Sequence, residues 1–158
     1  MAEGKIHLRQ ILQMGVMVEK RGEEFYKGLA DRPGDTKTRE LYRRLADAET
    51  RHKEFIEKTL AEWKPIALDA ASMRVFDQET RFRGIFASPP PPDSSEEDAA
   101  KYAVAQEWKM VDFYRFFEND FPDAWRAMKL QELVEEERRH VKAIVAAYPQ
   151  LKDLTAMA

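Results

Sequence analysis

The sequence predicts an all-α fold, a four-helix bundle made of two antiparallel hairpins that are joined by a long crossover connector. Three observations lead to this prediction. Apolar residues recur at helical spacing along four long segments, a short turn containing proline divides each pair of segments, and about thirty residues separate the two pairs. Because neighbouring bundle helices are usually joined by roughly two to eight residues, the longer stretch indicates a connector that runs the length of the bundle.

The expected elements follow from helix start and stop patterns. The helices are predicted at about residues 6–31, 35–63, 95–119 and 123–148, with the connector at about 64–94. Asp35 or Thr36 is expected to cap the second helix, and Ser94 or Ser95 the third, because short polar side chains accept hydrogen bonds from the free N–H groups of a first helical turn. Prolines follow the second and fourth helices and end them.

The connector is divided in character. Its first half, Asp69–Arg83, has a loosely amphipathic pattern that favours a short helix packed on the bundle. Its second half contains four consecutive prolines, which favour an extended, stiff segment.

Composition limits the classes of function. A chain of 158 residues with 44% hydrophobic residues predicts a single domain that spans 1–158. The 26 basic and 29 acidic residues nearly balance, so neither a nucleic acid nor an anionic membrane is expected as a partner. The absence of cysteine excludes disulfides, thiolate catalysis and cysteine-bound metal clusters in this chain. No apolar run suits a secretion signal or a membrane span, and a cytoplasmic location is the expectation.

The second half of the chain repeats the chemistry of the first half at an offset of 88 residues. The matched pairs are Glu19 with Glu107, Phe25 with Phe113, Tyr26 with Tyr114, Glu49 with Glu137, Arg51 with Arg139, and His52 with His140. The turns coincide as well, so both hairpins are predicted to be built alike.

The repeated glutamates are placed symmetrically about the turns. Glu19 and Glu49 each lie 15 residues from Gly34, and the glutamates of the second half stand likewise about Pro122. In an antiparallel hairpin such residues share one height, and the three-residue step of Glu-x-x-His puts both side chains on one helix face. Packing the hairpins face to face therefore gathers four carboxylates and two imidazoles inside the bundle.

This composition predicts a site for two metal ions. Four buried carboxylates must either be protonated or bind cations, and two divalent ions balance their charge. Mixed carboxylate and imidazole ligands favour iron or manganese over magnesium or calcium, with zinc also possible. The expected ligands are Glu19, Glu49, His52, Glu107, Glu137 and His140.

One glutamate on each of two helices and Glu-x-x-His on the other two is the ligand pattern of ferritin-like di-iron and di-manganese proteins. The spacing Glu-x6-Tyr followed by Glu-x2-His, present twice, resembles the rubrerythrin branch of that superfamily. The resemblance covers all four helices and implies a ferritin-like bundle with a non-haem di-iron centre that reacts with oxygen or hydrogen peroxide. A homodimer or higher homo-oligomer is a further expectation from the resemblance.

The resemblance also implies roles for individual residues. Glu49 and Glu137 would bridge two iron ions, the remaining two glutamates, Glu19 and Glu107, would be terminal ligands, and each histidine would bind one ion. Tyr26 and Tyr114 would donate hydrogen bonds to ligand carboxylates, with a plain core position as the alternative.

Two departures from the rubrerythrin pattern bear on the activity. Met110 stands where rubrerythrins have an extra carboxylate one turn after the third-helix glutamate, and no cysteine is present for a rubredoxin domain. Both departures favour a ferroxidase-like centre, or one that takes electrons from an external donor. Iron binding or storage without turnover and a metal-free helical adaptor are the alternative functions.

The remaining polar and aromatic residues are given ordinary roles. The polar side chains expected on the surface are His7, Glu23, Arg51, Glu135, Glu136 and Arg139. The alternative for Glu23 is a further carboxylate of the metal site, and the alternative for the two arginines is a supporting charge. Three tryptophans, Trp63, Trp108 and Trp125, are interpreted as anchors of a helix end or an interface, with electron relay as the alternative.

Overall fold

The computed structural model describes residues 8–62, 82, 84–118 and 129–156, and within them every regular element is a helix. The elements are α1 (Leu8–Ala30), α2 (Thr36–Glu62), α4 (Glu96–Phe117), α6 (Gln131–Ala147) and the 3-10 helix η3 (Pro149–Ala156). The predicted all-α, ferritin-like bundle is confirmed. None of the described helices is both long and apolar enough to cross a lipid bilayer.

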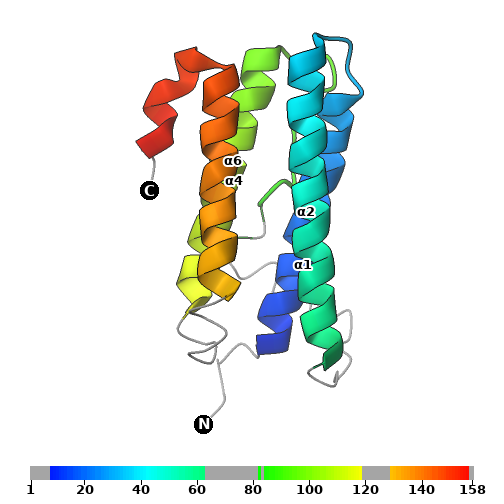
Figure 1. Cartoon of the computed structure of the whole chain (residues 1–158), viewed down its shortest axis with the longest axis vertical. Coiled ribbons are helices and arrows are strands. Elements are labelled where there is room, and N and C mark those ends of the chain that lie inside the picture. Colours follow the sequence, from blue (N-terminus) through cyan, green and yellow to red (C-terminus); the bar gives the residue numbers. More distant parts are fainter. Residues whose placement is uncertain (1–7, 63–81, 83, 119–128, 157–158) are drawn as a thin grey trace.

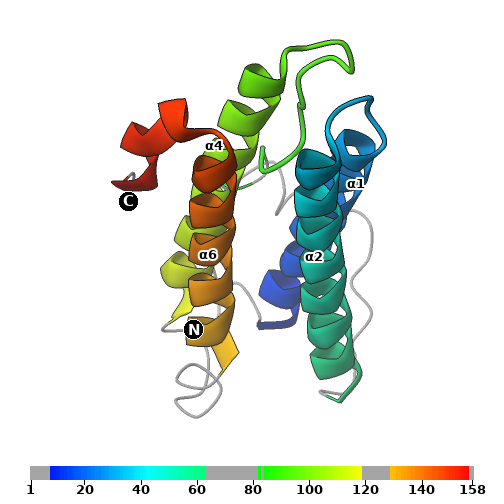
Figure 2. The same ribbon diagram turned by 45° about the horizontal axis from the view of Figure 1, so that its top comes forward.

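The bundle consists of two hairpins that lie side by side (Figures 1 and 2). α1 pairs with α2, and α4 pairs with α6. The chain runs up α1, down α2, down α4 and up α6, so α2 and α4 are parallel, and α4 begins at the opposite end of the bundle from the end of α2 (Figure 1). The hairpins meet where α2 faces α6 and α1 faces α4.

Side-chain caps begin two of the helices. The Thr38 N–H donates to Asp35 Oδ1 at 2.8 Å at the start of α2, and the Asp98 N–H donates to Ser95 Oγ at 3.0 Å at the start of α4. Asp35 and Ser95, rather than their neighbours, are therefore the caps. The acidic first turn of α4 adds negative charge at the positive end of the helix dipole.

The described part of the connector packs into the bundle. Phe82, Ile85 and Phe86 are all buried. Phe86 has a φ of 53°, a left-handed conformation that costs a non-glycine residue about 1–2 kcal/mol. Its N–H donates to Gln106 Oε1 at 2.7 Å, and its ring lies 5.5 Å from that of Phe25. These contacts hold the strained residue between the two hairpins.

The connector is also tied to the first hairpin at its proline end. Arg32, in the turn after α1, donates to the carbonyl oxygens of Pro91 and Pro92 and to Ser94 Oγ. These contacts join the segment before α4 to the turn of the first hairpin.

The C-terminal η3 is anchored by Trp108, whose Nε1–H donates to the Leu154 carbonyl oxygen at 2.8 Å. This agrees with the anchoring role expected for that tryptophan. Several predictions lie outside the described residues, namely the positions of His7, Trp63 and Trp125, the short helix within Asp69–Arg83, and the start of the fourth helix at about 123.

The packing of Phe86 gives a stability prediction. Phe86→Ala removes a buried ring but keeps the unfavourable φ, so it should lower the free energy of unfolding by about 3–5 kcal/mol. Phe116→Ala, at a side chain that is 54% exposed, is the control and should cost less than about 1 kcal/mol. Urea unfolding followed by circular dichroism measures both, and equal losses would contradict the role given to the connector.

Candidate metal centre

The six predicted ligands lie together at the centre of the bundle, one or two from each long helix. The four glutamates are 0% exposed, and His52 and His140 are 4% and 7% exposed. α1 and α4 each contribute one glutamate, and α2 and α6 each contribute a glutamate and, one turn later, a histidine. The structure therefore brings together the whole set that the repeat singled out.

The six residues form two groups that could each hold a metal ion. One group is Glu19, Glu49, His52 and Glu137, and the other is Glu49, Glu107, Glu137 and His140. Within each group the candidate ligand atoms lie within 4.8 Å of one another. The two groups share Glu49 and Glu137, so two ions would be neighbours.

Both histidines direct Nδ1 into the centre. His52 Nδ1 lies 2.9 Å from Glu137 Oε1 and 3.4 Å from Glu19 Oε2. His140 Nδ1 lies 3.2 Å from Glu49 Oε1 and 3.3 Å from Glu107 Oε1. The imidazole rings stack 5.8 Å apart at 15°, which places α2 and α6 face to face across the site.

Many polar atoms of the centre are buried without a hydrogen bond. They are both carboxylate oxygens of Glu49 and of Glu137, one oxygen each of Glu19 and Glu107, and His52 Nδ1. Buried polar groups are almost always hydrogen-bonded, and exceptions need an explanation. A cluster of unsatisfied oxygens that converge from four helices has the donor chemistry of a site for divalent cations, so the residues fit a pair of metal ions.

Two tyrosines donate hydrogen bonds to the remaining oxygens of Glu19 and Glu107, which we call the outer glutamates. Each tyrosine belongs to the opposite hairpin from the glutamate that it contacts. Tyr26 of α1 donates to Glu107 Oε1 at 2.6 Å, and Tyr114 of α4 donates to Glu19 Oε1 at 2.5 Å. Helical side chains lean toward the N-terminus of their own helix. Because α1 and α4 run in opposite directions, the side chains of Tyr26 and Glu107 lean toward each other. Glu19 is on the same helix as Tyr26 and leans in the same direction, so it leans away from that tyrosine.

Burial and mutual repulsion shift the pKa values of the two shared glutamates upward. Burial, followed by the charge of Glu137, raises the pKa of Glu49 well above its ordinary value. Burial, followed by the charge of Glu107, raises the pKa of Glu137 to about 8. Without metal, these carboxyls therefore retain protons near neutral pH.

The pKa values of His52, His140 and Glu107 are determined mainly by neighbouring groups of opposite charge. Burial by itself lowers the pKa of both histidines. The negative charges of Glu19 and Glu137 outweigh this effect at His52, and the charge of Glu107 outweighs it at His140. Both histidine pKa values are therefore raised. Burial also raises the pKa of Glu107, but His140 and hydrogen bonds lower it to about 2. Protons thus supply positive charge that a metal would replace.

Glu23 corrects one expectation. It was expected to be exposed, but it is 7% exposed and accepts a hydrogen bond from Thr50 Oγ1. Lys27 Nζ and Lys53 Nζ lie 3.5 Å and 3.4 Å from its carboxylate oxygens. Because Glu23 is one turn after Glu19, it shares the face of α1 that packs on α2. It belongs to neither ligand group and joins α1 to α2 instead.

Glu136 corrects a second expectation. It was expected on a solvated face with Glu135, but its side chain is 29% exposed and makes a hydrogen bond with His52 Nε2. The repeat could not identify it, because the equivalent position of the first half is Ala48. Arg51, Glu135 and Arg139 are exposed, in agreement with their expected roles.

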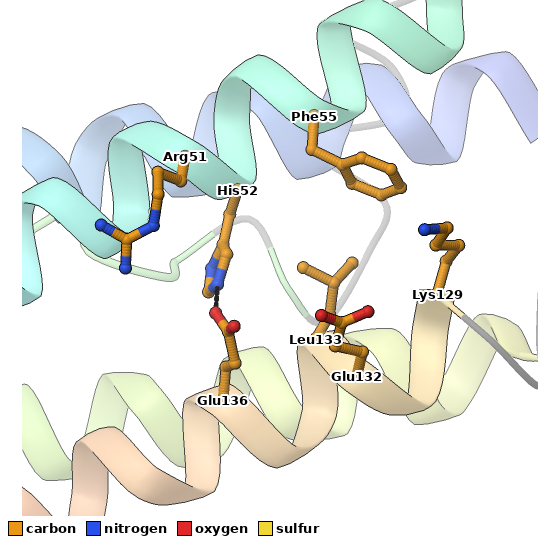
Figure 3. Close-up of a pocket in the computed structure, with 7 residues that line it drawn as sticks. All are labelled: Arg51, His52, Phe55, Lys129, Glu132, Leu133 and Glu136. Atoms are coloured by element: carbon orange, nitrogen blue, oxygen red, sulfur yellow. Dashed lines mark hydrogen bonds and ion pairs between the residues drawn. The ribbon is translucent and has the colours of Figure 1, made fainter.

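A cavity of about 210 Å³ opens beside His52, between α2 and α6 (Figure 3). Glu136 and Glu132 line one side of it, and Phe55 faces them from α2 (Figure 3). Lys129 Nζ lies 5.6 Å from the centre of the Phe55 ring. Solvent therefore comes close to one end of an otherwise buried centre.

Met110 and the equivalent residue of the first half, Gly22, differ in the size of their side chains. Met110 is fully buried one turn after Glu107 and supplies no carboxylate. The equivalent residue in α1 is Gly22, where a Cβ atom would lie 3.2 Å from the Phe86 ring and 3.3 Å from Glu49 Oε2. The missing side chain makes room for both the connector and the shared carboxylate.

The helical bundle and its convergent carboxylates and histidines define a ferritin-like protein with a candidate dinuclear metal centre. The rubrerythrin family model matches residues 10–85, which include α1 from Gln10 onward, α2 and the candidate ligands Glu19, Glu49 and His52. The first half of the chain is thus similar to the rubrerythrin family, and the match suggests a di-iron protein. No curated protein and no solved structure matches the chain. The candidate ligands of the second hairpin lie outside this match and are indicated by the internal repeat.

The crossed tyrosine contacts give a second prediction. Tyr26→Phe and Tyr114→Phe each remove the tyrosine donor of a buried carboxylate oxygen, which should cost about 1.5–3 kcal/mol of stability in the metal-free chain. Tyr102→Phe, at a half-buried tyrosine outside the centre, is the control and should cost less. Chemical unfolding in the presence of a chelator measures the three variants, and equal losses would contradict the prediction.

The pKa shifts predict an unusual pH dependence for the metal-free chain. In the folded state, raised pKa values are found for two glutamates and two histidines, namely Glu49, Glu137, His52 and His140. Their ordinary values are 4.5 for glutamate and 6.5 for histidine, so the folded state binds more protons than the unfolded chain. The extra protons contribute fully to the stability of the folded state when the pH is below these ordinary pKa values. This contribution is lost as the pH rises through the folded-state pKa values, which for Glu137 is about 8. Each extra proton corresponds to about 1.4 kcal/mol per pH unit. The lowered pKa of Glu107 acts in the opposite direction, but only as pH falls from 4.5 toward about 2.

Stability of the chelator-treated chain should therefore decrease from about pH 5 to pH 8, whereas metal-loaded chain should become more stable because metals displace these protons. Urea unfolding at several pH values tests this, and Glu137→Gln should reduce the slope of the metal-free chain. A metal-free chain that gains stability over this pH range would contradict the assignment.

Proposed function

We propose that the chain is a non-haem di-iron oxidoreductase that oxidises Fe(II) with oxygen or hydrogen peroxide, in the manner of a ferroxidase or a peroxidase. The observation that carries this proposal is the set of buried, unsatisfied carboxylate oxygens that converge between the hairpins. Four carboxylates carry the charge that two divalent ions would balance, and neutral histidines add no further charge. Manganese or zinc could occupy the same ligands.

The hydrogen bonds distinguish bridging from terminal ligands. Glu49 and Glu137 give no carboxylate oxygen to a tyrosine and belong to both groups, so each could bridge two ions. Glu19 and Glu107 each give one oxygen to a tyrosine and keep one free, which suits a ligand to a single ion. This division supports the roles that the rubrerythrin resemblance implies.

The surrounding residues support redox chemistry. Bound iron would supply the cycle between Fe(II) and Fe(III) on which reduction of oxygen or peroxide depends. The carboxylates would stabilise the higher charge of oxidised iron, and the tyrosines hold Glu19 and Glu107 in position. Electrons for repeated turnover would come from an external donor, because the chain holds no cysteine for an iron–sulfur site.

Iron loading tests this function. The chain is loaded anaerobically with Fe(II), its iron content is measured, and oxygen or hydrogen peroxide is then added. We expect two iron ions per chain, a ligand-to-metal absorption band after oxidation, and consumption of the oxidant. Two iron ions without oxidation would indicate a carrier, hundreds per particle would indicate storage, and no iron would indicate a metal-free scaffold.

A matched pair of variants tests the ligand assignment. Glu49→Gln combined with Glu137→Gln removes the two shared carboxylates and should abolish binding of both ions. Glu132→Gln combined with Glu135→Gln removes the same charge from exposed positions of α6 and should retain two ions per chain. Chelation should lower the melting temperature of the parent and control chains but leave that of the ligand variant unchanged, since a ligand of the native state stabilises folding.

A further inference from the structure

The two halves of the centre match in their ligands but differ outside the histidines. The outer nitrogen of His52, Nε2, makes a hydrogen bond with Glu136 of α6. The residue that is equivalent to Glu136 in the first half is Ala48, which is buried and carries only a methyl group. His140 therefore lacks the corresponding carboxylate from α2.

The contact with Glu136 determines how His52 can bind a metal. Its Nδ1 points into the centre, 2.9 Å from Glu137 Oε1, while Nε2 points away from it toward Glu136 (Figure 3). A carboxylate beside Nε2 favours a proton on that nitrogen, which leaves the lone pair of Nδ1 for a metal ion. The same contact fixes the orientation of the imidazole ring and makes Nδ1 a stronger donor.

Glu136 is itself held in place. It precedes Glu137 on α6, and Arg139 Nη2 lies 3.9 Å from its second oxygen, Oε1. Its side chain forms part of the wall of the cavity between α2 and α6, so the Glu136–His52 contact lies where solvent reaches the centre. The ligand group that contains His52 is thus both supported by a carboxylate and adjacent to an opening.

We propose that Glu136 is a positioning residue for His52 and makes the two metal positions inequivalent, so that the group of Glu19, Glu49, His52 and Glu137 binds its ion more tightly than the group containing His140. This inference rests on the dinuclear site proposed above. It adds a residue that the internal repeat does not contain, and it assigns an order of filling to two otherwise similar ligand sets.

Titration of the metal-free, full-length chain with Co(II) tests the inference. Visible absorption reports the geometry of each bound ion, and calorimetry reports each affinity. The parent chain should bind two ions with different affinities. Glu136→Ala should weaken the tighter event about 10–100-fold, the usual cost of losing a partner of a metal-bound histidine, and should leave the weaker event unchanged.

Two further variants separate the contributions of Glu136. Glu136→Gln keeps an acceptor for the Nε2 proton but loses the charge, so its affinity should lie between those of the parent and Glu136→Ala. Glu135→Gln removes the same charge from an exposed neighbour and should leave both affinities unchanged. A change in the Co(II) spectrum confined to the tighter ion would show that the effect acts through one position.

The outcomes distinguish this inference from the proposed function. Two equal affinities in the parent chain, or two unchanged affinities in Glu136→Ala, would overturn the inference and leave the dinuclear site in place. Equal weakening of both events would also overturn it. Absence of Co(II) binding in the parent chain would overturn the proposed function itself, and the inference with it.

Discussion

The structure depends on the enclosure of four glutamates in the middle of a helical bundle. Moving a carboxylate out of water costs several kcal/mol unless opposite charge or hydrogen bonds compensate for it. Here two histidines and two tyrosines compensate in part, and seven atoms of the ligand residues are left without hydrogen bonds. In the metal-free chain, retained protons reduce the remaining repulsion. The bundle therefore keeps donor atoms available to a ligand at the expense of its own metal-free stability.

The same requirement couples the hairpins to one another. Each hairpin contains a tyrosine and an outer glutamate, yet Tyr26 and Tyr114 reach the glutamate of the opposite hairpin. Because α1 and α4 are antiparallel and their side chains lean toward opposite ends, neither hairpin can satisfy its own glutamate in this way. The connector adds Phe86 to the space that Gly22 leaves open beside Glu49. The centre is consequently a property of the assembled bundle, and an isolated hairpin would lack it.

The sequence predicts the parts of the molecule that repeat. The helical pattern predicts four helices, and the offset of 88 residues predicts which six ligands converge, because equal distances from two turns fix their heights. The crossing of the tyrosine contacts depends on which helices face each other, and residue spacing does not contain that information. Glu23 and Glu136 depend on the rotation of α1 and α6 about their axes. The burial of Phe86 depends on a strained backbone that no local pattern indicates.

Residues outside the repeat make the two ligand groups of the centre inequivalent. If only the ligands mattered, two identical ligand sets would hold two equivalent ions, and a symmetric site would have no preferred side for its substrate. Glu136 in place of a methyl group, and a cavity beside His52, break this equivalence on one side of the bundle. Gly22 makes room for Phe86 beside Glu49, whereas the second half has Met110 at the equivalent position, and this is a second difference between the halves. The proposed pair of metal ions would constrain the six repeated ligand positions, whereas the surrounding positions are free to differ. Those differences would determine which ion lies nearer to solvent.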